Sequence, residues 1–258
     1  MASIAQNHKH QFQHAVFCRT LALVMRTRLL STLLPAAALL VALTACSTGG
    51  APAAPTDERS ASASADPTSP PALRPGWDAT AGTITLGEGP TRIDVWFDPM
   101  CPYCKQFDEA QRDALTDWST RDGSQVVLHP LTFLDRVAQG SAYSTRAATV
   151  LAAAAEQDPA AVLPILLDLY DRQPAEQTAG LDDDALRAIA KAHGVDAAKA
   201  LADRPWDATF RKLSAEAFSG RDAITGTPTM RVDGREVPSG QLYETDLRKQ
   251  VDTYLDQH

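Results

Sequence analysis

The sequence feature that most restricts the fold is one Cys-x-x-Cys pair, Cys101 and Cys104, placed between a strand pattern and a helix pattern. Residues 91–97 (TRIDVWF) are rich in β-branched and aromatic side chains and predict a strand. Residues 101–118 predict a helix, with Pro102 at the first helical position, where proline is favoured. Cys101 is therefore expected at the N-terminus of this helix, where unpaired backbone N–H groups and the helix dipole stabilise a thiolate.

The two cysteines are expected to differ in reactivity. The pKa of a free cysteine, about 8.5, falls to between about 3.5 and about 7.5 in such a setting. Cys104 follows one turn later on the same helix face, within reach of Cys101 for ring closure. We expect it to be more buried and less acidic than Cys101. The pair is therefore predicted to consist of an attacking thiol, Cys101, and a resolving thiol, Cys104.

The rest of the cysteine and histidine content argues against a structural role for this pair. The other two cysteines, Cys18 and Cys46, lie in the N-terminal segment. A disulfide that closes so short a loop stabilises a fold very little. A structural zinc site normally has four ligands. After Cys46 the chain offers no second Cys-x-x-Cys and three histidines, His129, His193 and His258. No metal site is predicted, and the pair is expected to serve thiol chemistry.

The N-terminal segment has the layout of an export signal. Residues 25–45 begin with Arg26 and Arg28, continue as an apolar run, and end in a small residue before Cys46. The closing Leu-Thr-Ala-Cys resembles the lipobox of bacterial lipoproteins, which implies that Cys46 is lipidated and becomes the first mature residue. The alternative is a retained membrane helix, for which the apolar run is at the short limit. Residues 1–24 have no place in this layout, and we interpret them as a mis-annotated N-terminal extension.

Composition separates a tether from a folded domain. Residues 46–76 are rich in Ser, Ala and Pro and lack an apolar period, so they are predicted to be a disordered tether. Residues 77–258 are long enough for one domain with its own core.

Residues 46–258 hold 20 Lys and Arg against 32 Asp and Glu, a net charge of −12. This acidic balance argues against nucleic-acid binding and against a polybasic contact with anionic lipid.

The elements after the cysteine helix predict an α/β domain with a helical insertion. The predicted order is a strand at 124–134, helices at 141–156, 158–171, 183–193, 196–203 and 206–218, a hairpin at 229–237, and a final helix capped by Ser239. Asp-Gly between the two short β runs is a strong signal for a two-residue turn. The helices form one block at about 139–220. Strands on either side of an all-helical block indicate a single α/β domain that carries an insertion.

These features resemble the thioredoxin fold, and in particular the DsbA-like thiol–disulfide oxidoreductases of bacterial cell envelopes. The resemblance rests on FDPMCPYC at 97–104, on the helical block, and on GTPT at 226–229 before the hairpin, and it covers roughly residues 80–258. It implies a thioredoxin-like fold with an all-helical insertion between the second strand and a cis-proline hairpin. It further implies a cis bond at Pro228 beside the active-site loop that contains Pro102, and client binding by Tyr103, Thr227 and Pro228.

Four residues near the predicted site, Asp94, His129, Trp96 and Tyr103, are candidates for a functional role. Many thioredoxin-like proteins carry a buried acid six residues before the first cysteine, but this chain has Val95 there. Asp94 precedes it, and strand alternation places Asp94 on the other face, where we expect a solvated or ion-paired acid. His129 is expected to be a surface or edge histidine with its hydrogen bonds satisfied. Trp96 is expected in the core, with lining of a client groove as the alternative, whereas Tyr103 is expected to be exposed.

The resemblance implies an enzyme that exchanges disulfides with exported proteins, most simply as an oxidase. It implies no cofactor beyond the redox-active Cys101–Cys104 disulfide, a membrane redox partner, and a position on the outer face of the bacterial cytoplasmic membrane through lipidated Cys46. A reductase or isomerase using the same site is the first alternative. A Cu(I) metallochaperone and a protein-binding module are the others, although no Met or His cluster accompanies the two thiols.

Overall fold

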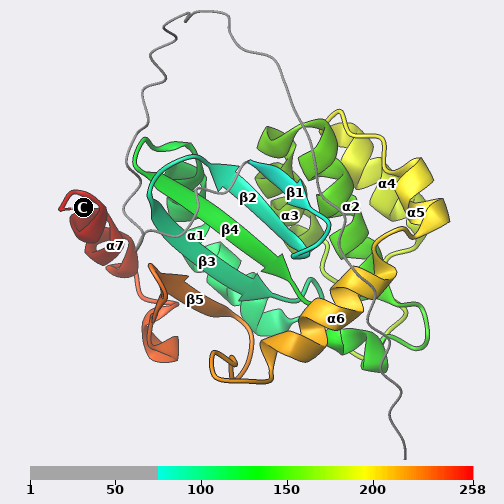
Figure 1. Ribbon diagram of the computed structural model, residues 1–258. Helices are drawn as coiled ribbons and strands as arrows, with labels where there is room; N and C mark the ends of the chain where they lie inside the picture. Colours follow the sequence, from blue (N-terminus) through cyan, green and yellow to red (C-terminus); the bar gives the residue numbers. More distant parts are fainter. Residues whose placement is uncertain (1–74, 258) are drawn as a thin grey trace, which may run out of the picture. The chain divides into compact units, whose positions relative to one another are not determined.

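The structure, a computed structural model, describes residues 75–257, which form a mixed six-stranded sheet with helices around it (Figure 1). The predicted extension (1–24), the signal (25–45), Cys46 and nearly all of the tether (46–76) lie outside the described residues. The strands are β1 (Gly76–Asp78), β2 (Thr83–Gly87), β3 (Thr91–Phe97), β4 (Ser124–Pro130), β5 (Thr229–Val232) and β6 (Arg235–Glu236), in the spatial order β1-β2-β4-β3-β5-β6.

The central unit is β3–α1–β4, in which helix α1 (Pro102–Thr120) connects two parallel strands. Alternate residues of β3 (Ile93, Val95 and Phe97) are buried in one core cluster with the inner face of α1, including Phe107 and Trp118. In Figure 1, α1 is seen behind the sheet. Because only residues 98–101 separate α1 from β3, this packing fixes the N-terminus of the helix at the carboxyl end of a buried central strand.

The helical insertion lies between β4 and β5, as predicted. It consists of α2 (Tyr143–Gln157), α3 (Val162–Asp171), α4 (Asp183–Ala192), α5 (Ala198–Asp203) and α6 (Asp207–Ala217), together with single 3-10 turns at Phe133–Val137 and Pro159–Ala161. Helix α2 is buried along thirteen consecutive residues, because α3, α4, α5, α6 and β1 all pack around it. The sequence does not show this directly, since its alanine-rich run lacks an amphipathic stripe. Pro164 stands at the third position of α3, which begins at Val162 and not at the predicted residue 158.

The C-terminal part returns to the sheet. Asp233 and Gly234 both have positive φ, 46° and 77°, as a tight hairpin turn between β5 and β6 requires. Helix α7 (Leu247–Leu255) packs beside α1, where Trp118 Nε1 donates to Asp252 Oδ1 at 2.8 Å. The sequence prediction for this helix was wrong at its start. Ser239 begins a separate 3-10 turn (Ser239–Gln241), and α7 begins only at Leu247.

Two strands escaped the sequence prediction. The short strand β1 begins at Gly76, one residue inside the predicted tether, and pairs antiparallel with β2. Strand β2 pairs in turn with β4, so β4 is an interior strand of the sheet.

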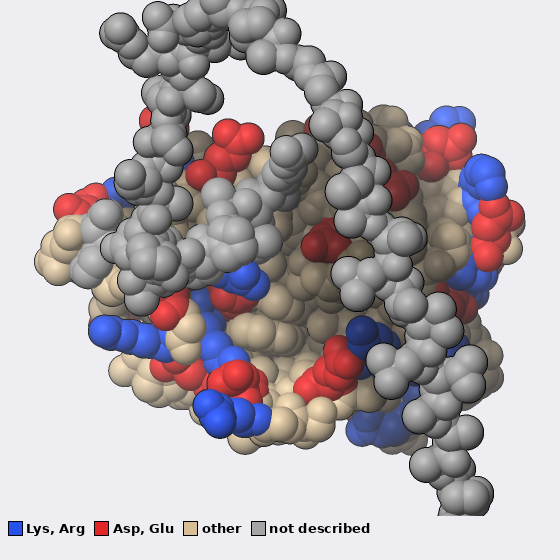
Figure 2. Space-filling model, viewed as in Figure 1, with Lys and Arg blue, Asp and Glu red and all other residues tan. Residues whose placement is uncertain are grey.

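On the face shown in Figure 2, acidic and basic side chains alternate around the rim, and neither sign forms a continuous patch. Within residues 75–257, no helix has the length and apolarity that crossing a bilayer would require.

Candidate active site

The cysteine pair occupies the N-terminus of α1, as predicted. Cys101 is the N-cap residue, with extended backbone angles, and Pro102 opens the helix. The amide groups of Cys104 and Lys105 donate to Cys101 O at 3.1 and 3.2 Å and close the first turn. Both cysteines are free thiols; Cys101 is 5% exposed and Cys104 is 1% exposed. The first turn of the helix therefore places the Cys101 sulfur at the edge of the core and the Cys104 sulfur inside the core.

The environment separates the two thiols in acidity. The hydrogen bond from the Cys104 thiol lowers the pKa of Cys101 to about 6, against the opposing effect of burial. Thr227 and the backbone amides of Tyr103 and Cys104 contribute to the same lowering. Burial raises the pKa of Cys104 well above its ordinary value, and the neighbouring Cys101 raises it further. The expected order, an acidic first thiol and a less acidic second thiol, is confirmed.

The Thr227–Pro228 segment lies against Cys101. The Thr227–Pro228 peptide bond is cis, as predicted. Cys101 Sγ is 3.6 Å from the carbonyl oxygen of Thr227, and the hydroxyl of Thr227 is buried without a hydrogen-bond partner among the described residues. Strand β5 begins directly afterwards and pairs Thr229 with Trp96 at the end of β3. The sheet therefore fixes this segment beside the first cysteine.

A buried acid, Asp98, anchors the loop between β3 and the cysteines. Asp98 is fully buried and accepts hydrogen bonds from Met100 N at 2.9 Å, Leu134 N at 3.0 Å and Ser144 Oγ at 2.6 Å. Burial raises its pKa to about 7, although these three donors oppose the shift. Because Ser144 belongs to α2 and Leu134 follows β4, this one carboxyl joins the cysteine loop to the helical insertion.

A second contact from the insertion reaches the same loop. The side-chain amide of Gln173, just after α3, donates to Pro99 O and to Cys101 O, each at 3.0 Å. Asp98 and Gln173 thus hold the loop from two sides. Neither residue was predicted from the sequence: Gln173 belongs to no motif, and the only signal for Asp98 is an acid three residues before Cys101.

Aromatic side chains surround the exposed side of the site. Tyr103, between the cysteines, is 59% exposed, as expected. Tyr243, which the sequence analysis did not identify, is 37% exposed, and its pKa is raised by burial and by the nearby charges of Cys104 and Cys101. Two tyrosines from distant parts of the chain therefore lie by the cysteine pair, with their rings open to solvent.

The expectation that His129 is a surface or edge histidine was wrong, although its hydrogen bond is made as expected, whereas the expectation of a solvated or ion-paired Asp94 is confirmed in its second form. Strand β4 is interior, so His129 is 7% exposed, and its Nε2 lies 2.6 Å from Asp94 Oδ1. Asp94 is 5% exposed and also pairs with Arg92 at 2.6 Å, so it is ion-paired and not solvated. Burial would raise the pKa of Asp94, but His129 and Arg92 lower it below its usual value. This cluster lies on the opposite face of β3 from α1, as strand alternation predicted.

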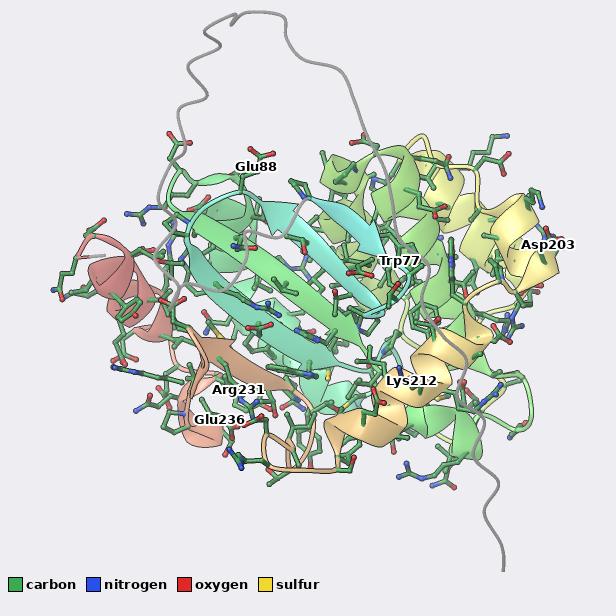
Figure 3. All side chains as sticks on the ribbon, viewed as in Figure 1. Trp77, Glu88, Asp203, Lys212, Arg231 and Glu236 are labelled. Atoms are coloured by element: carbon green, nitrogen blue, oxygen red, sulfur yellow. The ribbon has the colours of Figure 1, made fainter. Side chains whose placement is uncertain are left out.

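The expectation that Trp96 is a core residue was also wrong. Trp96 is half-buried on the same sheet face as Asp94 and stacks on the His129 ring with 4.2 Å between centroids. The guanidinium of Arg231 lies 5.0 Å from the Trp96 ring centroid and is held by Glu236 at 3.0 Å. Figure 3 shows Arg231 and Glu236 together at the β5–β6 hairpin. Alternate residues of β3 point away from α1, and their side chains form a charged network. Trp96 belongs to this set, which is why it is not a core residue.

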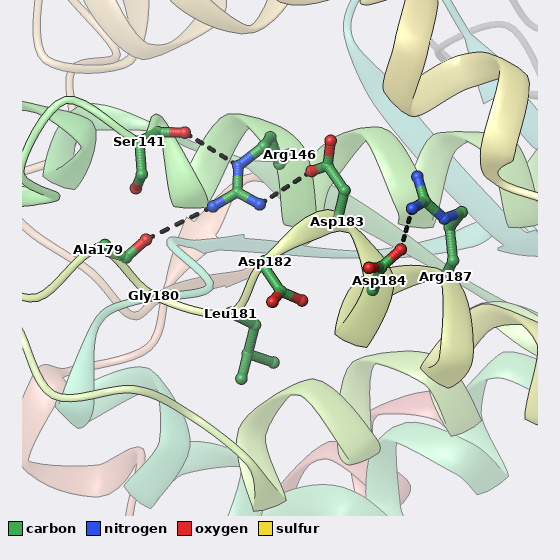
Figure 4. Close-up of a pocket in the computed structure, with 9 residues that line it drawn as sticks. All are labelled: Ser141, Arg146, Ala179, Gly180, Leu181, Asp182, Asp183, Asp184 and Arg187. Carbon is green, nitrogen blue, oxygen red and sulfur yellow. Dashed lines mark hydrogen bonds and ion pairs between the residues drawn. The ribbon is translucent and has the colours of Figure 1, made fainter.

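A pocket of about 470 Å³ lies in the helical insertion and contains neither cysteine (Figure 4). Its main feature is Arg146, which donates to Ser141 O at 2.9 Å, to Asp183 Oδ1 at 2.9 Å and to Ala179 O at 3.4 Å. Arg146 is 7% exposed, so these contacts join α2 to the start of α4. Within residues 75–257, no group of three or more His, Cys, Asp or Glu side chains is arranged to hold a metal ion.

The fold and the site together define a class of protein. An acidic thiol at a helix N-terminus, a buried second thiol one turn later and a cis-proline beside them form an arrangement that suits thiol–disulfide exchange, in a thioredoxin-like fold with a helical insertion. Residues 92–251 match the DSBA-like thioredoxin domain family. The chain belongs to this family and is a thiol–disulfide oxidoreductase. No curated protein matches it in sequence.

Solved structures share the fold. The chain is similar to reduced DsbA from Mycobacterium tuberculosis, with 22% identity and a TM-score of 0.52 over 57% of this chain and 75% of that chain. MdbA, a thiol–disulfide oxidoreductase from Actinomyces oris, has 22% identity and a TM-score of 0.56 over 68% and 89%. Oxidised BdbD from Bacillus subtilis has 17% identity and a TM-score of 0.55 over 72% and 98%. The predicted fold class is confirmed.

Proposed function

We propose that the protein oxidises the thiols of exported proteins through Cys101 and Cys104, with no bound cofactor. A client thiolate attacks Sγ of Cys101 in the oxidised protein, the Cys101–Cys104 bond breaks, and a client–Cys101 mixed disulfide forms. A second client thiolate then attacks the client sulfur and releases Cys101 as a thiolate. The client leaves with a disulfide, and both cysteines are left reduced.

The observation that carries this proposal is the acidity of Cys101. Its pKa of about 6 makes it mostly a thiolate at neutral pH and a good leaving group in the second step. Stabilising the reduced form in this way makes the oxidised form a stronger oxidant. The names of the solved relatives, DsbA and two thiol–disulfide oxidoreductases among them, agree with this chemistry.

Client binding is assigned to the surface around Cys101. Pro228 has no N–H and is buried, whereas the Thr227 carbonyl beside it reaches the site and offers a backbone acceptor to an extended client chain. Tyr103 and Tyr243 add exposed aromatic surface on which client side chains can pack. This arrangement suits unfolded or extended clients with accessible thiols, and it does not select for a particular client sequence.

The same proposal places the enzyme outside the cytoplasm. The signal layout of residues 25–45 and the lipobox-like ending at Cys46 support a lipid anchor on the outer face of the cytoplasmic membrane. Fatty-acid labelling that disappears in a Cys46→Ala variant tests the anchor. Reoxidation then requires a membrane redox partner, by family analogy a quinone-linked protein.

The redox equilibrium of the pair with glutathione distinguishes an oxidase from a reductase. A strong oxidase is expected near a potential of about −120 mV, whereas a reductase lies near about −270 mV. The measurement is the fraction of oxidised Cys101–Cys104 against the ratio of glutathione to its disulfide, in the full chain with Cys18 and Cys46 replaced by serine. A potential close to the second value would contradict the oxidase direction and favour the reductase.

A further inference from the structure

The segment between α6 and β5 leads into the Thr227–Pro228 bond that lies against Cys101. Residues 218–228 contain neither helix nor strand, and Asp222 among them is exposed. A backbone without regular hydrogen bonds opens more easily than a helix or a strand, unless other parts of the fold hold it. The position of the Thr227 carbonyl, to which we assign client binding, therefore depends on the contacts that hold this segment.

Strand β5 holds the segment through two side chains. Arg231 Nη1 donates to Asp222 O at 3.1 Å, nine residues back along the chain. The hydroxyl of Thr229 donates to Gly226 O at 2.8 Å. Together the two bonds anchor both ends of the stretch that directly precedes the cis-proline. The bond from Arg231 is the longer-range of the two, because it fastens the exposed part of the segment to the sheet.

The guanidinium of Arg231 is itself held by its neighbours (Figure 3). Its Nη2 donates to Glu236 Oε2 on β6 at 3.0 Å, and the Arg231 side chain is 14% exposed. The guanidinium carbon lies 5.0 Å from the centroid of the Trp96 ring, a distance at which a cation is attracted to the face of the ring. A lysine would not reproduce these contacts, because its single ammonium has no planar face to stack and cannot reach two acceptors in the same way.

Trp96 is held in turn by the interior of the sheet. Its ring stacks on His129 of β4 with 4.2 Å between centroids, and His129 Nε2 lies 2.6 Å from Asp94 Oδ1. Contacts therefore run without interruption from an interior strand, through Trp96 and Arg231, to the segment beside Cys101. No member of this cluster has a task in the exchange reaction, so its function has to be sought in what it supports.

We infer that Arg231 is a positioning residue for client binding, which holds residues 222–226 to the sheet so that Thr227 presents its carbonyl in a fixed place. The inference rests on the proposed role of Thr227 as an acceptor for the client backbone. A preformed acceptor favours binding, because the segment does not have to be ordered when the client arrives. A small dithiol without a peptide backbone reacts at Cys101 and makes no use of this acceptor.

The kinetic test compares a protein client with dithiothreitol. The parent chain is the oxidised full chain with Cys18 and Cys46 as serine. It is mixed with increasing excess of a reduced, unfolded test protein, and loss of the Cys101–Cys104 disulfide is followed by acid quenching and mass. The concentration dependence gives the half-saturating client concentration and the limiting rate. Dithiothreitol in place of the client gives the rate of exchange without a polypeptide on the client surface.

The variant Arg231→Met keeps the apolar stem of the side chain and removes the guanidinium. We expect its half-saturating client concentration to rise at least about fivefold, with little change in the limiting rate. Its rate with dilute client should fall at least about fivefold more than its rate with dithiothreitol. Arg231→Lys keeps the charge and should shift the client reaction in the same direction. Arg235→Met removes an exposed charge from the same hairpin and is the matched control, with parent values expected.

Hydrogen exchange measures the position of the segment without any reaction. The backbone amides of residues 223–227 are expected to exchange about tenfold faster in Arg231→Met than in the parent chain, whereas the amides of β3 should not change. Because this measurement needs neither client nor active thiol, it is readable even if the proposed function fails. That failure has its own signature, which is client oxidation that continues in Cys101→Ser.

A half-saturating client concentration in Arg231→Met equal to that of the parent chain would overturn the inference. Unchanged exchange at residues 223–227 would overturn it as well. So would equal losses of rate with client and with dithiothreitol, because that pattern shows a damaged active site and not a displaced segment. Should Arg231→Met fail to fold, Arg231→Lys carries both comparisons, and parent values in that variant would contradict the inference.

Discussion

Replacing Cys101 by serine is expected to reduce catalysed oxidation of a client to the uncatalysed background. Serine has a hydroxyl that does not ionise near neutral pH and cannot form a mixed disulfide, so no later step can begin. The measurement is the rate at which a reduced, unfolded test protein with one native disulfide regains that disulfide with the oxidised enzyme. Normal catalysis by Cys101→Ser would show that the chemistry lies elsewhere.

The companion variant Cys104→Ser is expected to accumulate mixed disulfides with clients. The Cys101 thiolate of this variant attacks a disulfide in a client and forms a mixed disulfide, and no neighbouring thiol is left to release the client from it. The adducts are seen as higher-mass bands in non-reducing gels and disappear on reduction. Cys18→Ser and Cys46→Ser, outside the pair, serve as controls and should form no such adducts.

The second large effect concerns stability at Asp98. Its pKa is raised from 3.8 to about 7 in the folded protein, so between these pH values the folded state holds the proton more tightly than the unfolded state. Stability from this group is therefore greatest at low pH and is lost as the pH rises toward 7, by roughly 4 kcal/mol over the whole shift. Asp98→Asn carries no such titration.

We expect the free energy of unfolding of Asp98→Asn to be lower than that of the wild type at about pH 4, because the amide leaves a buried N–H donor unsatisfied, at about 1–3 kcal/mol. The difference should shrink and reverse as the pH rises to 7. Asp122→Asn, an exposed acid, should give a difference that does not change with pH. A wild type that gains on Asp98→Asn as the pH rises would contradict the raised pKa.

Features set by short sequence patterns could be predicted from the sequence. The strand, helix and cysteine order at residues 91–118 follows from residue types and from Pro102, and the turn at Asp233-Gly234 follows from its two residues. The helices of the insertion appear within a few residues of their predicted bounds. In each case the determining contacts are local, so the sequence alone carries them.

Features that depend on contacts between distant parts of the chain could not be predicted. β1 is three residues long and exists because it pairs with β2. His129 lies in an interior strand because β2 pairs with the other edge of β4, and its ring is in contact with Trp96 and Asp94 of β3, which no pattern near His129 shows. Asp98 meets Ser144, and Gln173 meets Cys101, across 46 and 72 residues of sequence. The cysteines were therefore predictable, whereas the residues that hold and tune them were not.

The most direct test of the account is the pH dependence of alkylation of Cys101 in the reduced full chain with Cys18 and Cys46 as serine. Modification by iodoacetamide, followed by mass at the Cys101 peptide, reports the thiolate fraction. The account predicts a rate that rises with a midpoint near pH 6, with Cys104 unreactive over the same range. A midpoint near about 8.5, the value of an ordinary free cysteine, would contradict it.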